Sequence, residues 1–132
     1  MRVNWNELRD EARSAMRRAY VPYSNYPVGA AGLVDDGRIV VGCNVENASY
    51  GLTLCAECGV VSQLVASGGG RLVALSCVDQ NGDPLTPCGR CRQLLFEHGG
   101  GDCLVDNTHP DEPQTVSELL PGAFGPQHLS SD

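Results

Sequence analysis

Residues 55–78 read CAECGVVSQLVASGGGRLVALSCV, and this stretch decides the fold class. Its first part, from about Cys55 to Ala66, has helical character and is followed by Ser67 and by the glycines Gly68–Gly70, which favour the end of a helix. Leu72–Val78 is an almost continuous apolar run of strand length, which is typical of a strand covered on both faces. A helix followed directly by such a strand indicates an α/β protein with this strand in the centre of the sheet.

The segments on either side continue the pattern. Before this stretch, apolar residues at helical spacing predict a helix over Trp5–Ala19, and two short apolar runs, Val28–Val34 and Arg38–Asn44, predict a β-hairpin. After it, Cys88–His98 predicts another helix and Cys103–Val105 a short strand. Turns and loops are expected at Pro84–Pro87 and 106–113, and at most one helical turn at Ser117–Leu120. The order of elements predicts an α/β layer with a mixed sheet.

The composition excludes several kinds of function. With 132 residues, 42% of them apolar, we expect residues 1–132 to form a single soluble domain. The net charge of −7 argues against a nucleic-acid partner, because phosphate binding depends on Lys and Arg. All nine basic residues are Arg, which excludes a Schiff-base or P-loop lysine. No stretch is apolar enough for a membrane span, and Met1–Glu7 lacks the apolar core of a secretory leader, so we expect a cytoplasmic protein.

Two Cys-x-x-Cys pairs, Cys55–Cys58 and Cys88–Cys91, each open a predicted helix. Residues three apart lie on one helix face, so each pair can direct two sulfurs to one point, and helix N-termini favour thiolates. Clustered cysteines in a reducing compartment are more often metal ligands than disulfide partners, which predicts one bound zinc ion. A closed four-cysteine structural site and a redox pair remain alternatives, although the 29 intervening residues (59–87) exceed the ~15–20 of a usual zinc ribbon.

Glu57 lies between the two thiols of the first pair. A catalytic zinc site has three protein ligands and an open position for water, and that water needs a nearby proton acceptor. An isolated Glu in the first turn of a helix is more often a solvated side chain. Its place between two thiols nevertheless favours the catalytic interpretation over the structural one.

The motifs resemble those of the zinc-dependent cytidine deaminases. The resemblance rests on Cys55-Ala56-Glu57 and Pro87-Cys88-Gly89-Arg90-Cys91, and with Cys as the first ligand the chain is similar to the small homotetrameric enzymes of the family. Further matching segments are Pro22–Ser24, Val28–Ala31, Gly42–Ala48 and Leu119–Phe124, so that nearly the whole chain is covered. The resemblance implies a three-layer α/β/α cytidine deaminase-like fold with a mixed central β-sheet.

The resemblance also implies a reaction and its main residues. Cys55, Cys88 and Cys91 would bind one zinc ion per subunit, and water activated by this zinc would attack C4 of the cytosine ring. Glu57 would take a proton from the water, pass it to N3 and assist the departure of ammonia. Cytidine and 2′-deoxycytidine would become uridine and 2′-deoxyuridine, as in pyrimidine salvage.

Five further positions are implied to contact the substrate. Asn44 and Glu46 match positions that hydrogen-bond the ribose, and Ala56 belongs to the first zinc motif. Tyr26 stands where the family usually has a Phe against the pyrimidine ring, and its hydroxyl needs a partner. Phe124 matches an aromatic residue that enters the active site of a neighbouring subunit. The resemblance therefore implies a homotetramer with active sites at its subunit interfaces and a small nucleoside as the bound partner.

Cys58 departs from the family pattern, which usually has an Arg directly after the catalytic Glu. Three thiolates leave the zinc centre with one excess negative charge, and donors near the sulfurs normally offset it. We expect Cys58 to be a neutral thiol beside the metal site, with Arg90, Arg92 or helix N–H groups as the compensation. As a fourth ligand it would close the site, as in a non-catalytic zinc-binding module. A blasticidin-type antibiotic deaminase shares the zinc motifs, but the segment Asn44–Asn47 favours the cytidine form.

Overall fold

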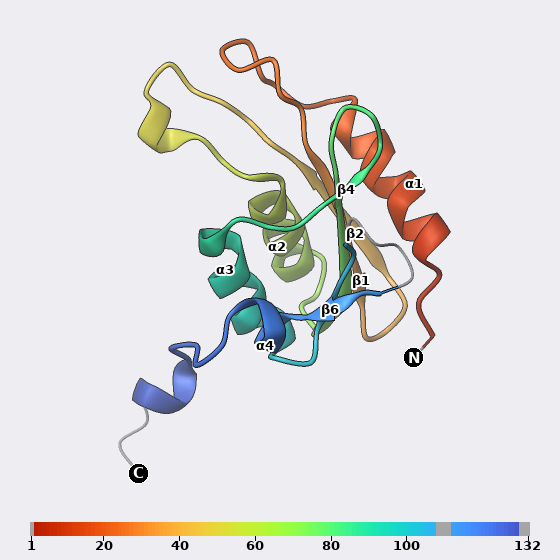
Figure 1. The fold of residues 1–132 in the computed structure, drawn as a ribbon, viewed down its shortest axis with the longest axis vertical. Coiled ribbons are helices and arrows are strands. Elements are labelled where there is room, and N and C mark those ends of the chain that lie inside the picture. Colours follow the sequence, from red (N-terminus) through yellow and green to blue (C-terminus); the bar gives the residue numbers. More distant parts are fainter. Residues whose placement is uncertain (1, 108–111, 130–132) are drawn as a thin grey trace.

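The structure is a computed structural model that describes residues 2–107 and 112–129 (Figure 1). Its helices are α1 (Trp5–Met16), α2 (Ala56–Ala66), α3 (Gly89–Gly99) and the short α4 (Val116–Leu119). Its strands are β1 (Gly29–Val34), β2 (Ile39–Cys43), β3 (Leu72–Val78), β4 (Pro84–Leu85), β5 (Leu104–Val105) and β6 (Gln114–Thr115). The 3₁₀ turn η1 (Tyr50–Leu52) lies between β2 and α2, and the 3₁₀ turn η2 (Pro126–Leu129) follows α4. None of the helices in the two described ranges is long and apolar enough to cross a membrane.

The strands form one mixed sheet in the order β2-β1-β3-β5-β6, with β4 paired to β3 beside this path. β3 and β5 are parallel, whereas β1 pairs antiparallel with both β2 and β3. β3 lies in the middle of the sheet and is buried along almost its whole length. The expected α/β class and the central position of Leu72–Val78 are therefore confirmed.

Each face of the sheet is covered by helices and has its own hydrophobic core (Figure 1). The core beneath α1 contains Leu8, Ala12, Met16, Ala31, Ala74 and Val78. The core beneath α2 and α3 includes Val40, Val60, Leu64, Leu72, Leu75 and Leu95. Ala74 and Leu75, which are consecutive in β3, thus face opposite cores, as the pleat of a strand requires. The three expected α/β/α layers are present.

Two glycines allow α2 to lie very close to β2. A Cβ atom on Gly42 would collide with the carbonyl oxygen of Ala56, and a Cβ atom on Gly59 would lie 2.9 Å from the Cα of Gly42. Two backbones can approach this closely only where neither residue carries a side chain. This contact seats the first turn of α2, which carries Glu57, against the end of β2.

α1 begins where the sequence suggests and ends earlier. Asn4 caps its N-terminus, because the Asn4 Oδ1 accepts a hydrogen bond of 3.1 Å from the Glu7 N–H. The α-helix ends at Met16 and not at Ala19. The N–H of Ala19 bonds three residues back, to the Met16 carbonyl, so the last residues form a tighter turn.

One short strand lies within an expected loop and another directly after one. Pro84–Leu85 forms β4 and pairs antiparallel with Cys77 and Val78. Gln114–Thr115 forms β6, directly after the expected loop 106–113, and pairs antiparallel with β5. A strand of two residues has no alternation that a sequence pattern could reveal, so these pairings depend on the neighbouring strand. Residues 108–111 of the second loop lie outside the described residues.

Candidate active site

Three thiols from two helix N-termini form a compact cluster. Cys55 and Cys88 are the N-cap residues of α2 and α3, and Cys91 lies in the first turn of α3. Because α2 and α3 contact each other, the three sulfur atoms lie within 4.8 Å of one another. The sulfurs of a tetrahedral zinc site with Zn–S bonds of ~2.3 Å lie ~3.8 Å apart, so the cluster is close to this geometry. A donor set of soft thiolates also suits zinc better than it suits harder cations.

The electrostatic surroundings of the three sulfurs differ. A backbone hydrogen bond from Cys91 lowers the pKa of the Cys88 thiol, which lies at the open N-terminus of α3. Burial raises the pKa of the Cys55 thiol. Burial also raises the pKa of the Cys91 thiol, and the nearby charge of Glu57 adds to this effect. Such thiols give up their protons when a cation offsets the new charge, which is what a bound metal ion does.

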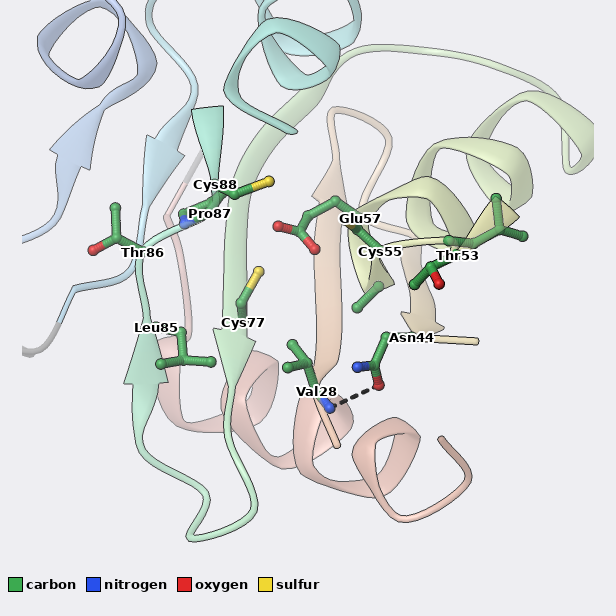
Figure 2. Close-up of a pocket in the computed structure, with 12 residues that line it drawn as sticks. Val28, Asn44, Thr53, Cys55, Glu57, Cys77, Leu85, Thr86, Pro87 and Cys88 are labelled. Atoms are coloured by element: carbon green, nitrogen blue, oxygen red, sulfur yellow. Dashed lines mark hydrogen bonds between the residues drawn. The ribbon is translucent and has the colours of Figure 1, made fainter. Parts of the chain in front are cut away.

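Glu57 lies beside the thiol cluster and is almost completely buried, with 5% of its surface exposed. Figure 2 shows its carboxylate and the Cys88 sulfur pointing into the same pocket. The rest of the pocket is lined by Val28, Asn44, residues 53–56, Cys77 and residues 85–87. A carboxylate that faces both a metal site and a pocket can carry protons to and from a bound molecule.

Cys77 is a pocket residue that none of the sequence motifs contains. Its side chain is 1% exposed, and its sulfur points towards Glu57 (Figure 2). Burial raises the pKa of the Cys77 thiol well above its ordinary value, so the thiol stays neutral. Side chains alternate between the two faces of a strand, so Cys77 lies on the same face of β3 as Leu75, which α2 covers. This alternation is the sequence signal that could have identified Cys77.

Cys58 lies outside the thiol cluster. The sulfurs that the described residues bring together for one metal ion are those of Cys55, Cys88 and Cys91. Cys58 is half-buried in the first turn of α2, and the Arg90 Nη2 lies 3.7 Å from its sulfur. This geometry does not support a closed site with four cysteine ligands.

Arg92 has backbone carbonyls as its hydrogen-bond partners. Its Nε donates to the Pro87 carbonyl at 2.8 Å, and its Nη1 donates to the Leu119 carbonyl at 2.9 Å. Pro87 directly precedes Cys88, and Leu119 ends α4. Arg92 therefore fastens the loop before one thiol to the C-terminal part of the chain.

Asn44 and Ala56, two of the residues expected to contact substrate, line the pocket. The Asn44 side chain also holds the adjoining loop (Figure 2), because its Oδ1 accepts a hydrogen bond of 2.9 Å from the Val28 N–H. Its Nδ2 donates to the Tyr26 carbonyl, also at 2.9 Å. An Asn side chain has two donor and two acceptor positions, so it retains one of each for a ligand.

Glu46, Tyr26 and Phe124 do not line this pocket in the described chain. Glu46 lines an adjacent hollow, and its carboxylate accepts hydrogen bonds from the N–H groups of Tyr23 and Ser24. Hydrogen bonds from Ser24, and then from Tyr23, lower the pKa of Glu46. Tyr26 is 51% exposed and Phe124 is 58% exposed. A single chain therefore brings only some of the expected substrate residues to the pocket.

Phe124 belongs to the C-terminal arm, residues 120–129, which extends away from the body of the molecule (Figure 1). Its ring stacks on His128 with the ring centroids 5.0 Å apart. The Gln93 Nε2 donates to the Phe124 carbonyl at 2.7 Å and so fastens the arm to α3. The arm thus carries an exposed aromatic ring, and the backbone of this residue is bonded to α3.

Similarity to known proteins covers almost the whole chain. Residues 4–106 match the family model described as the cytidine and deoxycytidylate deaminase zinc-binding region. A cytidine deaminase from Mycobacterium tuberculosis is 63% identical over 123 residues, which are 93% of this chain and 91% of the relative. One from Sporosarcina psychrophila is 45% identical over 123 residues, which are 91% of this chain and 90% of the relative. The crystal structure of the M. tuberculosis enzyme gives a TM-score of 0.90 at 62% identity, covering 94% of this chain and 99% of that one. For the Mycobacterium leprae enzyme the TM-score is 0.87 at 59% identity, with coverage of 91% and 99%.

Proposed function

The chain belongs to the zinc-dependent cytidine deaminase family, and on this basis we propose that it hydrolyses cytidine and 2′-deoxycytidine to uridine and 2′-deoxyuridine with release of ammonia. We assign this activity to one domain, residues 1–132, and to pyrimidine salvage in the cytoplasm. All seven cysteines are free thiols, which agrees with a reducing compartment.

The placement of Glu57 carries this proposal. Its buried carboxylate lies between the three-thiol cluster and the pocket, so a single group can serve both a metal-activated water and a bound ring. In a structural zinc site the four ligands leave no open coordination position for water. A buried carboxylate in this position would then have no metal-bound water with which to exchange a proton.

The chemistry follows from these positions. Cys55, Cys88 and Cys91 would hold the zinc ion, which would lower the pKa of a water molecule so that it could act as a nucleophile near neutral pH. Glu57 takes a proton from the attacking water and delivers it to N3 of the cytosine ring, which prepares C4 for attack. The same carboxyl group then transfers the second proton of the water to the 4-amino group, which leaves as ammonia. Its burial limits competition from bulk water during these transfers.

We assign substrate recognition to Asn44 and Ala56 in the pocket and to Glu46 beside it. An amide and a carboxylate suit the hydroxyl groups of a sugar, and a buried acceptor left unpaired would disfavour a bare base. The described residues that line the pocket include no basic side chain. This lining fits a neutral nucleoside better than a phosphorylated one.

We also propose a homotetramer in which neighbouring chains complete each active site. Two loops near the pocket are joined by backbone bridges, and both carry exposed apolar side chains. These side chains are Tyr20, Tyr23, Val45, Tyr50, Leu52 and Leu54. A contiguous apolar patch of this kind is typical of an interaction surface. Tyr26 would approach the pyrimidine ring from one of these loops, and Phe124 would enter from a neighbouring chain.

Turnover of cytidine by the purified zinc-loaded protein tests the proposal. It is measured as the loss of the near-ultraviolet absorbance of the cytosine ring. Glu57→Gln keeps the shape of the side chain but cannot carry protons, so we expect kcat to fall by about a thousandfold. Bound zinc, measured by atomic absorption, should stay at one ion per chain. Zinc-loaded wild-type protein without turnover, or a Glu57→Gln variant with unchanged kcat, contradicts the assignment.

A further inference from the structure

A divalent metal ion held by the thiol cluster leaves negative charge in one place. Three thiolates around such a cation leave one excess negative charge. The N-termini of α2 and α3 lie at Cys55 and Cys88 and offset part of this charge. Metal sites of this kind normally have further donors or cations around the ligand sulfurs.

The pocket side of the cluster provides no such cation. No Arg and no His is among the described residues that line the pocket. Arg92, although next to Cys91, donates to the carbonyls of Pro87 and Leu119. A compensating cation therefore has to lie on the side of the cluster that faces away from the pocket.

Arg90 lies there. It belongs to the first turn of α3, between Cys88 and Cys91, and its side chain reaches across to α2, where its Nη2 is 3.7 Å from the Cys58 sulfur. The Cys58 N–H in turn bonds the Cys55 carbonyl at 3.0 Å. Neither Arg90 nor Cys58 lines the pocket. One guanidinium thus spans the two helix ends that carry all three clustered thiols.

We propose that Arg90 is a positioning residue of the zinc centre, whose guanidinium offsets the thiolate charge and ties the ligand-bearing ends of α2 and α3 together. The inference rests on the proposed function, since it concerns the same zinc centre. Arg90 does not touch the substrate, so it acts on zinc affinity and on kcat and leaves KM unaffected. Cys58 is its contact on α2 and is small enough to leave room for the guanidinium.

Arg90→Ala tests this role through zinc affinity, measured by competition with a chromogenic chelator. Removal of a group beside metal ligands typically weakens binding 10–100-fold, and because Arg90 is exposed we expect about 10-fold. At saturating zinc, kcat falls while KM for cytidine stays within about twofold. Arg90→Lys should recover most of the zinc affinity. Arg18→Ala, which removes an exposed Arg just beyond α1, is the matched control and should bind zinc like the wild type.

A relocated cation gives the sharper test. Combining Cys58→Arg with Arg90→Ala moves the guanidinium from α3 to α2 but keeps it between the same two helix ends, so zinc affinity should return to within about threefold of the wild type. Unchanged affinity in Arg90→Ala, or a double variant as weak as Arg90→Ala, overturns the proposal. The zinc measurement needs no substrate. If the variants change zinc affinity as expected but the wild-type protein does not deaminate cytidine, the proposed function is contradicted. The role of Arg90 is then still supported.

Discussion

Glu57 and Cys58 are neighbours in the chain but have different surroundings. Consecutive side chains on an α-helix are rotated by about 100°, so the Glu57 carboxylate enters the pocket while the Cys58 thiol faces Arg90 on α3. Together with Cys55, they give one helix end three different side-chain environments within four residues. Substitutions at 57 and 58 should therefore have different consequences.

Cys58→Ser tests whether this thiol binds the metal. A serine hydroxyl can still accept a hydrogen bond from Arg90 but is a poor zinc ligand, so we expect zinc to stay at one ion per chain and kcat to remain within about threefold of the wild type. Zinc content and cytidine turnover measure both effects. Loss of the metal together with the activity would show instead that Cys58 is a ligand.

The thiol cluster could be predicted from the sequence because residue type and spacing are sufficient for it. Two thiols three residues apart at the start of a helix share a face wherever that helix packs. The surroundings of Cys77 and Arg92 could not be predicted in this way. Cys77 reaches Glu57 because β3 presents that face to α2, and Arg92 reaches Leu119 because α4 packs against α3.

The seating of α2 on β2 decides where the first thiol pair lies. The contact runs backbone to backbone at Gly42 and Gly59, and it leaves no space for a methyl group. α2 carries Cys55 and Glu57, whereas Cys88 and Cys91 belong to α3. A shift of α2 relative to α3 would therefore separate the sulfurs.

Gly42→Ala should disturb both the fold and the metal site. The added Cβ meets the Ala56 carbonyl oxygen, so we expect a loss of about 2 kcal/mol in the free energy of unfolding, together with weaker zinc binding. Urea denaturation and chelator competition measure the two effects. Gly51→Ala is the control, since a Cβ atom at Gly51 has open space around it. Equal stability of the two variants would contradict this account of α2.

Long elements were easier to predict than short ones, for a physical reason. β3 and the three long helices carry enough apolar residues to show their period, and their expected positions agree with the structure within a few residues. β4 and β6 each have two residues, and they form by pairing with the neighbouring strands β3 and β5. The tight turn after Met16 depends in the same way on local hydrogen bonds that no apolar pattern records.

At the scale of the whole molecule, one chain provides the thiol cluster and the pocket but leaves several aromatic side chains exposed. The C-terminal arm that carries Phe124 leads away from the body (Figure 1). Exposed apolar side chains also lie on the loops near the pocket. Burying these surfaces between copies would remove apolar area from water. The proposed tetramer accounts for both features at once.

Co-expression of two variants with low activity tests whether neighbouring chains share an active site. Glu57→Gln and Phe124→Ala should each have low activity as separate assemblies, because one lacks the proton carrier and the other the aromatic residue for its neighbour. Co-expressed chains should regain activity, since some sites then combine an intact Glu57 with an intact Phe124 from another chain. Light scattering should give four times the mass of one chain. A mixture no more active than its parts, or a monomeric mass, contradicts the proposal.

The position of the three thiols along the chain has a consequence for folding. Cys55 and Cys91 bracket α2 and the central strand β3, so a metal ion bound to both closes a loop that contains the middle of the sheet. A covalent cross-link around a loop of this length would restrict the unfolded chain by about 4 kcal/mol. A zinc ion held at this place is thus a reversible cross-link, and its removal lowers the free energy of unfolding without breaking any covalent bond.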